Sequence, residues 1–469
     1  MGNPRLRNSS LSIVVLAAGL GTRMKSARAK VLHPLAGRPM IRHVLDTLEQ
    51  LSPERIVVVV GEEMAGVREM VAPHPTVVQR ERLGTAHAVM AAGEALSGLT
   101  GDVLIAYADT PLINAETFAR VLAARHAPPQ PAVVVLGFRP ADPGAYGRLV
   151  TNSDGGLEAI VEAKDATPEQ LAIGLCNSGM MAVDAARLPG LLARVGNDNA
   201  KREYYLTDLV HLARADGLAC AVVEGEVEEL IGVNSRADLA AAERIVQDRL
   251  RAKAMADGAT LVDPDTVFFS WDTRLGRDVT VAPFVTFAPG VCVGDDVEIR
   301  SFCHLEGASV AAGAQIGPYA RLRPGAAIGE GAHIGNFVEV KNTTVETGAK
   351  VNHLTYVGDA RVGAKANVGA GTITCNYDGF SKSLTDIGAG AFIGSNTALV
   401  APVRIGDGAI VGAGSVIASD VAADAMALTR AAQAEKPGWA KAFRDRKSAA
   451  KALAAKEKGE RAKVKGETN

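Results

Sequence analysis

One apolar side chain returns every six residues through the second half of the chain. It occupies Leu275, Val281, Phe287, Val293, Ile299 and Leu305, and after a five-residue step it continues at Val310, Ile316, Leu322, Ile328, Ile334 and Val340. A helix repeats its apolar face about every 3.6 residues and a two-sided strand about every two, so neither explains this period. A solenoid of short strands does, because each apolar residue fills the axis and a small residue permits each tight corner.

The repeat spans about residues 263–420 and ends with a run from Ile387 to Ile417. It predicts a parallel β-helix in which three such segments close one triangular coil. Between Thr374 and Ile387 the step is 13 residues instead of 12, and the sequence there breaks the pattern. We therefore expect a loop to project near Asn376–Lys382.

The first half of the chain has a different pattern, and 469 residues are enough for more than one domain. Apolar runs of strand length alternate with stretches of helical composition such as Met40–Leu51 and Ala86–Leu96. The runs are Ile13–Leu16, Ile56–Val60, Val103–Tyr107 and Val133–Leu136. Buried parallel strands that alternate with helices predict a Rossmann-like α/β sheet.

The stretch Ala237–Ala256 contains no Gly or Pro and predicts an exposed helical arm of roughly 30 Å between the halves. The expected divisions are a first domain at residues 1–236, a helical linker at 237–256, a solenoid domain at 257–435 and a basic tail at 436–469. Each half is expected to bury its own core, so the two are expected to be separable.

Composition argues against several classes of protein. The 50 basic and 52 acidic residues nearly balance, so charge gives no reason to expect nucleic-acid binding. Five cysteines without a CxxC pair favour a reducing cytoplasm over a disulfide framework. The apolar run Ile13–Ala18 is too short for a secretory or membrane segment and is followed by Arg23 and Lys25. A cytoplasmic protein without membrane insertion is expected.

A glycine-containing loop follows the first predicted strand, and it reads Leu16-Ala17-Ala18-Gly19-Leu20-Gly21-Thr22-Arg23-Met24, with Lys30 a few positions later. Glycines there let the backbone approach a phosphate chain, whose charge amide groups, Arg23 and Lys30 would meet. A Walker loop is absent from the sequence, and Met24 occupies the third glycine position of a dinucleotide fingerprint. The loop resembles the signature of the sugar-nucleotide pyrophosphorylases, which implies a nucleotide as ligand.

Further strings extend this resemblance. The loop with Gln79, Gly84 and Thr85 resembles the uracil-binding loop of the uridylyltransferases, and Tyr107-Ala108-Asp109 ends a strand where a carboxylate can hold Mg²⁺. The resemblance implies contacts of Gly147, Glu162 and Asn177 with an acetylated sugar, and it makes Asn234 the second Mg²⁺ ligand beside Asp109. Taken alone, Gln79 also fits a polar turn and Asp109 a turn former. Ala108, Ala29 and Leu20 depart from the usual Gly, Pro and Lys.

The solenoid carries polar groups outside its repeat. Arg323 and Lys341 are expected to point off the prism, and His353 and the loop Asn376–Lys382 follow. Two cations, a histidine and a polar loop predict a site for an anionic sugar. Taken alone, His353 fits a surface or interface histidine better. Cys375 has no neighbour that would lower its thiol pKa, so we expect it to be structural.

These strings resemble the bifunctional N-acetylglucosamine-1-phosphate uridyltransferases and glucosamine-1-phosphate N-acetyltransferases over nearly the whole chain. The resemblance implies a left-handed β-helix with His353 as the general base and with Arg323 and Lys341 on the sugar phosphate. Tyr356 and Asn367 would contact the sugar, and the residues implied at acetyl-CoA are Ala370, Asn376, Tyr377, Ser395, Ala413 and Arg430.

The resemblance therefore implies an enzyme that makes UDP-N-acetylglucosamine from glucosamine 1-phosphate, acetyl-CoA and UTP, and that assembles as a homotrimer. Arg23, Lys30 and Mg²⁺ would neutralise charge during uridylyl transfer, which needs no protein nucleophile. An enzyme with only the nucleotidylyltransferase, in which the solenoid serves assembly, is one alternative. A regulatory subunit with an inactive first domain is another. The joint presence of both residue sets argues against both alternatives.

Overall fold

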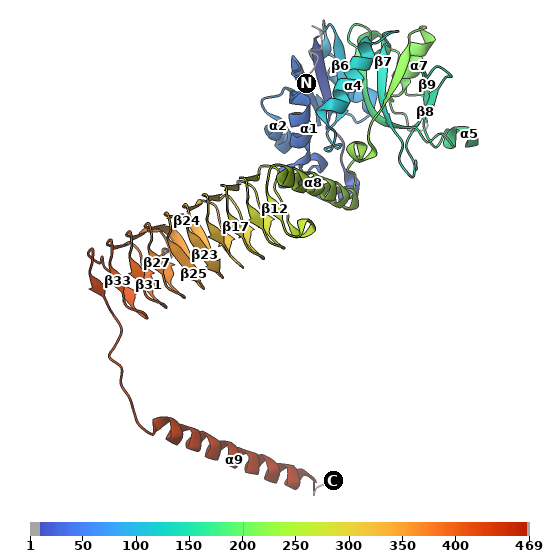
Figure 1. Ribbon diagram of the computed structural model, residues 1–469. Helices are drawn as coiled ribbons and strands as arrows, with labels where there is room; N and C mark the ends of the chain where they lie inside the picture. The colour runs from blue at the N-terminus through green and yellow to red at the C-terminus, as the bar shows by residue number, and fades with distance from the viewer. Residues whose placement is uncertain (1–9, 200, 467–469) are drawn as a thin grey trace.

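An α/β domain, a straight solenoid and a C-terminal helix follow one another along the chain (Figure 1). The computed structural model describes residues 10–199 and 201–466. The hydrophobic core has separate clusters in the solenoid and on the two sides of the first domain's sheet. Within the described residues, no helix is both long and apolar enough to cross a lipid bilayer.

The sheet of the first domain has seven strands along its main path. Their order is β11 (Cys220–Glu224), β7 (Val133–Phe138), β10 (Cys176–Asp184), β6 (Asp102–Tyr107), β1 (Leu11–Leu16), β4 (Arg55–Gly61) and β5 (Thr76–Gln79). A side hairpin of β8 (Arg148–Thr151) and β9 (Leu157–Val161) attaches to β10. The central strands consist mainly of buried apolar residues because both faces of the sheet are covered.

Helices cover both faces of this sheet. One side packs against α1 (Met40–Glu49), α2 (Ala65–Val71) and α4 (Ala115–His126), and the other against α3 (Thr85–Ala91), α6 (Leu188–Leu192) and α7 (Asp208–Ala215). The short helix α5 (Pro168–Leu171) is capped by Thr167. The expected helix Ala86–Leu96 is shorter than predicted, because α3 ends at Ala91 and a 3₁₀ turn follows at Glu94–Leu96. These three layers confirm the α/β class.

The four predicted strands β1, β4, β6 and β7 all run in the same direction, which confirms the expected parallel arrangement. β10, which was not predicted, is inserted antiparallel between β6 and β7. Its sequence CNSGMMAVD begins with polar and small residues, so it lacks the continuous apolar run of a buried strand.

The solenoid has three faces of short parallel strands. The first face contains β12 (Thr260–Leu261), β14 (Thr280–Val281), β17 (Glu298–Ile299), β20 (Gln315–Ile316), β23 (His333–Asn336), β25 (Lys350–His353), β27 (Asn367–Val368), β30 (Phe392–Ile393), β33 (Ile410–Val411) and β35 (Met426–Ala427). The second contains β15 (Thr286–Phe287), β18 (His304–Leu305), β21 (Arg321–Leu322), β28 (Ile373–Cys375), β31 (Ala398–Val400) and β34 (Val416–Ile417). The third contains β13 (Arg274–Leu275), β16 (Cys292–Val293), β19 (Ser309–Val310), β22 (Ala326–Ile328), β29 (Thr385–Ile387) and β32 (Val403–Ile405).

Two longer strands, β24 (Glu339–Val345) and β26 (Tyr356–Val362), run round the corner from the second face to the third. The six-residue position points into the axis: Phe287, Ile316 and Ile393 are at most 1% exposed. Fully burying such a side chain contributes about 1.5–3 kcal/mol. The period therefore predicted the parallel β-helix correctly. The expected loop also projects, with Tyr377 and Lys382 bridging its base.

The helix α8 (Arg236–Ala256) joins the two domains, and the expectation of an exposed arm is wrong. Ala242, Gln247 and Arg251 of this helix are at most 6% exposed. Its apolar side chains complete a cluster with Leu35 and Met40 of the first domain. Its many Ala, Arg and Glu residues had suggested an exposed helix, but Gln247 and Arg251 are buried because they satisfy backbone groups of the first coil.

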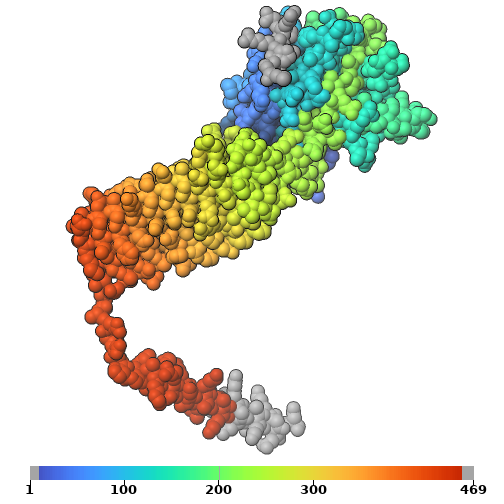
Figure 2. All heavy atoms as spheres, viewed as in Figure 1, coloured from blue at the N-terminus to red at the C-terminus, as the bar shows by residue number. Residues whose placement is uncertain are grey.

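The tail separates from the solenoid after the last coil. The helix α9 (Trp439–Gly466) follows an irregular segment, and residues 429–456 are exposed throughout. In Figure 2 this part of the chain stands clear of the other atoms. Trp439 and Phe443, one helical turn apart in α9, stack on each other with ring centroids 5.3 Å apart.

Candidate functional site

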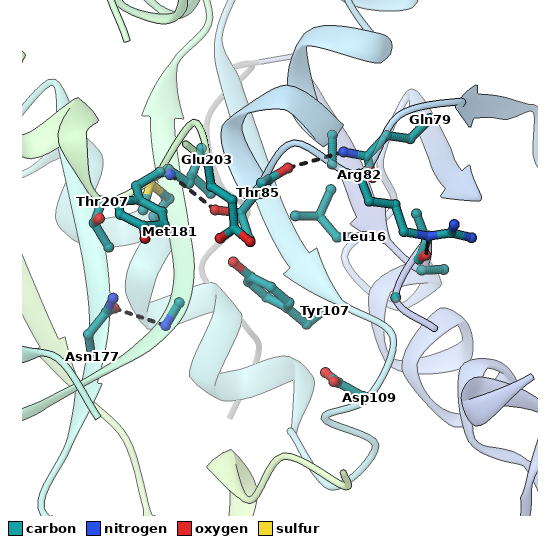
Figure 3. Close-up of a pocket in the computed structure, with 18 of the residues that line it drawn as sticks. Leu16, Gln79, Arg82, Thr85, Tyr107, Asp109, Asn177, Met181, Glu203 and Thr207 are labelled. Atoms are coloured by element: carbon teal, nitrogen blue, oxygen red, sulfur yellow. Dashed lines mark hydrogen bonds between the residues drawn. The ribbon is translucent and has the colours of Figure 1, made fainter. Parts of the chain in front are cut away.

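A cavity of about 430 Å³ opens at the carboxyl ends of β1 and β6. Ligands of such sheets bind beyond the carboxyl ends of the strands, and this volume lies in the range of small-molecule sites. Figure 3 shows Thr85, Tyr107 and Asn177 around this space. The predicted site residues that line it are Leu16, Ala17, Ala18, Gly19, Lys30, Gln79, Gly84, Thr85, Tyr107, Asp109, Glu162 and Asn177.

Lys30, Asp109 and Asn234 meet at the edge of this cavity. The Lys30 ammonium forms an ion pair with the Asp109 carboxylate and donates to Asn234 Oδ1 at 3.0 Å. Lys30 is 8% exposed, so its charge is held by these two oxygens. Asn234 comes from far along the sequence, just before α8, whose Asp238 accepts a hydrogen bond from the Asn234 amide. Two oxygen atoms thus converge on one cation.

Three predicted site residues neither line the cavity nor belong to this cluster. Arg23 is exposed in a 3₁₀ turn at Thr22–Met24, beside the glycine loop. Ala108 is fully buried in the core, so its methyl group does not reach the cavity, because the residue after β6 packs beneath the sheet. Gly147 is buried, and its carbonyl accepts a hydrogen bond from the Asn177 amide at 2.8 Å.

Several lining residues were missed from the sequence, chiefly Arg82, Glu203, Tyr205 and Thr207. The Arg82 guanidinium donates to the Ala18 carbonyl at 2.7 Å and thereby holds the glycine loop. The segment with Glu203 reaches the cavity by backbone pairing of Tyr204 with residues 83 and 86. Irregular segments carry no periodic signal. Because Glu203 also lies far from the glycine loop along the chain, the sequence gives no sign of this contact.

The polar groups and the wall of the cavity are held in place by their neighbours. Burial, and next the Asp109 carboxylate, raise the pKa of Tyr107, so its phenol stays protonated and can donate. Gln79 is 4% exposed, and its amide donates to the Gly84 carbonyl at 3.1 Å. Gly179 passes so close to the Tyr107 ring that an added Cβ would lie 3.0 Å from it, with φ at +89°. The cavity wall therefore requires glycine at that position.

A cationic surface lies at the corner between the second and third faces of the solenoid. Arg323 and Lys341 occupy successive coils, with the Arg323 amide bonded to the Val340 carbonyl. Arg323 donates to Glu339 at 2.7 Å, and Lys341 lies 3.8 Å from the Asp359 carboxylate. The cations are partly exposed, so their charges remain available to a ligand.

Lys382, which the sequence analysis did not select, joins this surface from the projecting loop. Close side-chain contact with Lys341 and repulsion between the two ammonium groups lower the pKa of Lys382. Burial raises the pKa of Asp359, but hydrogen bonds from Asn342 and Asn376 and the charges of both lysines outweigh it and lower that pKa. Two cations thus share one carboxylate, and an added anion would relieve their repulsion.

Tyr356 and Asn376 lie together beside this cationic surface. The Asn376 amide contacts Tyr356 Oη at 3.5 Å and also donates to Asp359. The Tyr356 ring folds over Gly358, where an added Cβ would come within 2.2 Å of the phenol oxygen. Tyr377 is exposed, and its hydroxyl donates to the Gly379 carbonyl at 2.6 Å. Asn367 lies on the first face instead, so the structure does not place it in this group.

His353 ends β25 at the corner between the first and second faces, next to the strand that begins at Tyr356. Its Nδ1 lies 2.6 Å from Asn336 Oδ1. An amide oxygen only accepts, so with this assignment Nδ1 carries the proton and Nε2 presents a lone pair. The side chain is exposed on a single chain. Asn336 is a further residue that the sequence analysis did not select.

The remaining predicted acetyl-CoA residues continue along this corner, which we call the first corner. Backbone bonds link His353 to residue 371, Ala370 to residue 396, and Ser395 to residue 414 in successive coils. Arg430 donates to the Ala413 carbonyl at 2.8 Å. Asn376 and Tyr377 follow β28 at its other end, so one chain does not place them on the first corner with Ala370.

Known proteins share both halves of this architecture. The family described as MobA-like NTP transferase domain matches residues 13–164. The bacterial transferase hexapeptide family matches residues 307–342 and 385–419. A bifunctional protein GlmU from Paramagnetospirillum magneticum is 64% identical over 447 residues, which cover 95% of this chain and 99% of the relative. One from Rhodospirillum rubrum is 70% identical over 431 residues, covering 92% and 96%.

An α/β nucleotidyltransferase domain joined to a left-handed hexapeptide β-helix defines a two-domain transferase. The chain belongs to the family of bifunctional GlmU proteins. It is a multifunctional enzyme with an N-acetylglucosamine-1-phosphate uridyltransferase and a glucosamine-1-phosphate N-acetyltransferase activity.

Proposed function

We propose that the chain makes UDP-N-acetylglucosamine in two steps at the two sites described above. Glucosamine 1-phosphate is acetylated on the solenoid, and the product receives a uridylyl group in the cavity of the first domain. The observation that carries this proposal is the presence on one chain of two separate polar sites. One is the Lys30, Asp109 and Asn234 cluster, and the other is the set of polar groups on the solenoid, with Arg323 and Lys341 at one corner and His353 at the next.

In the cavity, a phosphate oxygen of the sugar 1-phosphate attacks the α-phosphorus of UTP in line, and pyrophosphate leaves. Catalysis then consists of positioning and charge neutralisation. Lys30 supplies a buried positive charge at the end of β6, and Arg23 stands beside the glycine loop for the outer phosphates. Gln79 and the amides of Gly84 and Thr85 meet the uracil. Glu162, Asn177 and Gly147 contact the acetylated sugar.

The chemistry of the donors fits Mg²⁺. A carboxylate oxygen of Asp109 and an amide oxygen of Asn234 already converge on one cation, the Lys30 ammonium. Magnesium prefers oxygen ligands and is often held by one or two side chains together with substrate phosphates. When bound, the ion would supply charge neutralisation at the phosphates. Asp109 and Asn234 would hold it, and Lys30 would turn to the phosphates.

On the solenoid, Arg323 and Lys341 hold the sugar phosphate, while Tyr356 and Asn367 orient the ring. Because these residues, His353 and the acetyl-CoA residues lie at different corners of one chain, the proposed site is shared between neighbouring subunits of the trimer. Nε2 of His353 takes a proton from the sugar amine, and the amine attacks the thioester carbonyl of acetyl-CoA. CoA leaves as its thiolate, and no acyl-enzyme forms. Asn376 and Tyr377 lie between sugar and thioester. The acetyl-CoA groove is formed by Ala370, Ser395, Ala413 and Arg430.

Two assays of the purified chain test this function. CoA release from acetyl-CoA should depend on glucosamine 1-phosphate, and pyrophosphate release from UTP should depend on N-acetylglucosamine 1-phosphate and Mg²⁺. Both activities in one preparation are the expected result. Pyrophosphate release alone would favour a nucleotidylyltransferase whose solenoid serves assembly, and neither activity would favour a regulatory subunit.

The enzyme is further proposed to be a cytoplasmic homotrimer. Its five cysteines are free thiols, which supports a reducing compartment.

The proposed subunit interface lies along the first corner, where four aromatic side chains stack with ring centroids 4.8–5.1 Å apart. This aromatic ladder consists of Phe284, Phe302, Tyr319 and Phe337, each about half exposed, and it leads through Leu354 to His353. The opposite, third face instead carries the ion pairs of Arg361 with Glu346 and Asp386.

Phe302→Glu should dissociate the trimer. A carboxylate in the ladder would be buried without a partner at each contact, which costs several kcal/mol. We expect monomers in sedimentation analysis, with acetyl transfer reduced and uridylyl transfer kept. The matched control is Thr344→Glu, which places the same charge on the third face and should leave the trimer intact. A trimeric Phe302→Glu variant would place the interface elsewhere.

A further inference from the structure

A short hairpin connects the cavity of the first domain to the solenoid. It consists of β2 (Pro34–Leu35) and β3 (Arg38–Pro39), joined by the two-residue turn Ala36-Gly37. Ala36 has φ at +46° and Gly37 at +79°. A residue with a Cβ keeps a left-handed conformation only where the surroundings hold it there, and such strained positions gather at functional elements. The contacts of this turn therefore show what holds it in this conformation.

Both domains hold the strained turn. The Ala36 amide donates to Glu243 Oε2 of α8 at 2.8 Å, and the Ala36 carbonyl accepts from the Trp271 amide of the first coil at 2.9 Å. Ala36 is 3% exposed. A Cβ added to Gly37 would lie 3.0 Å from both Ser270 Oγ and Pro289 Cγ of the solenoid. The tip of the hairpin is thus seated on the first coils.

A side-chain stack strengthens this seat. The Arg38 guanidinium carbon lies 3.9 Å from the centroid of the Trp271 ring. The same guanidinium forms two hydrogen bonds with the Asp46 carboxylate of α1. A cation over an indole face is attracted by the ring quadrupole. Trp271 of the solenoid, Arg38 of the hairpin and Asp46 of the first domain therefore form one connected unit.

The base of the hairpin is fixed to Lys30. The Met40 amide donates to the His33 carbonyl at 3.0 Å and closes the hairpin, and the His33 amide donates to the Lys30 carbonyl at 3.2 Å. Lys30 in turn contacts Asp109 and Asn234. A continuous set of bonds therefore runs from the first coil, through the hairpin, to the proposed metal ligands.

The helix α8 provides a second, parallel link. Asn234 lies just before its first residue. Farther along, the Gln247 side chain donates to the Phe269 carbonyl at 2.7 Å and accepts from the Phe269 amide at 2.8 Å. Both sides of the Lys30 and Asn234 pair are thus anchored on Phe269–Trp271 of the solenoid.

We infer that the first coil of the solenoid is a working part of the uridylyltransferase, and that Trp271 is a positioning residue that holds Lys30 through the hairpin. This inference rests on the proposed function of the cavity. The solenoid then serves both reactions, with its first coil for uridylyl transfer and its later coils for acetyl transfer. The first domain is then not fully separable from the solenoid, in contrast to the expectation from the sequence.

Trp271→Ala in the full-length chain tests the inference. Removal of the ring takes away the aromatic face on which Arg38 is seated and loosens the turn. Small misplacements of groups that position reacting phosphates cost up to about 10²-fold. We expect the kcat of uridylyl transfer to fall roughly tenfold, with a smaller change in the KM for UTP, because separate elements line the nucleotide cavity. Acetyl transfer, measured on the same sample, should not change. Trp271→Phe keeps an aromatic face over Arg38 and should restore most of the kcat.

Three results would overturn the inference. The first is a Trp271→Ala variant with unchanged kcat for uridylyl transfer. The second is an equal loss of both activities, which would make Trp271 merely a stability residue. The third is a Trp271→Phe variant as impaired as Trp271→Ala. Trp439→Ala on the exposed tail is the matched control. Lys30→Ala, assayed alongside, separates the two claims, since full activity there would refute the proposed role of Lys30 itself.

Discussion

His353→Ala is expected to lower acetyl transfer by roughly 10²–10⁴-fold, the usual worth of a positioned general base. Sugar amines are largely protonated near neutral pH, and only the free base attacks a thioester. Nε2 is the nitrogen available for this proton because Asn336 engages Nδ1. Uridylyl transfer should continue at the normal rate, since the residue lies in a different domain. CoA release and pyrophosphate release, measured on one preparation, give the comparison.

The controls distinguish a catalytic role of His353 as a general base from a purely structural role. His304→Ala removes another exposed histidine of the solenoid and should change neither activity. Lys341→Ala should mainly raise the KM for glucosamine 1-phosphate, because a phosphate contact exists in both the ground and the transition state. Full acetyl transfer by His353→Ala at every pH between about 6 and 9 would assign the proton to another group. A variant that falls apart into monomers would show a role at the interface.

Asp109→Ala is expected to abolish Mg²⁺-dependent pyrophosphate release and to leave acetyl transfer near normal. The substitution removes one of two protein oxygens from the cation cluster and leaves the Lys30 ammonium without its ion-pair partner. Metal stabilisation of charge is worth several kcal/mol, and each 1.4 kcal/mol is about tenfold in rate, so a loss of at least about 10²-fold should follow.

Asp142→Ala provides the matched control for this variant, because Asp142 is an exposed carboxylate of the same domain. Its pyrophosphate release should equal that of the unchanged chain. Raising the Mg²⁺ concentration should recover part of the activity of Asp109→Ala if the affinity for the ion is what was lost. Uridylyl transfer by Asp109→Ala at the unchanged rate and with unchanged Mg²⁺ dependence would remove Asp109 from the metal site.

The sequence predicted the solenoid because its signal is local and repeated. Every coil places an apolar side chain such as Ile316 on the axis, so one period describes the whole domain. The antiparallel strand β10 was not predicted because its first half, Cys176–Gly179, is polar or small, and because pairing with β6 and β7 is set by long-range topology. The burial of α8 was missed for a related reason, since its buried Gln247 is polar and finds its partner at Phe269.

The same distinction between local patterns and long-range contacts applies to the residues of the candidate sites. Motif residues on strand ends, such as Asp109 and Gln79, were chosen from the sequence, and the structure places both at the cavity. Tyr205 and Glu203 come from an irregular segment and were not chosen. Lys382 was overlooked because its role depends on its proximity to Lys341, which only the folded loop produces. Contacts between distant segments, rather than residue types, account for what the sequence did not reveal.

The central claim is that one chain carries two separate transferase sites, which act one after the other. The most direct measurement mixes His353→Ala with Asp109→Ala and supplies glucosamine 1-phosphate, acetyl-CoA, UTP and Mg²⁺. Each variant alone should form almost no UDP-N-acetylglucosamine. The mixture should form it readily, because one variant releases N-acetylglucosamine 1-phosphate and the other uses it. A mixture as inactive as its components, despite normal uridylyl transfer by His353→Ala and normal acetyl transfer by Asp109→Ala, would contradict this account.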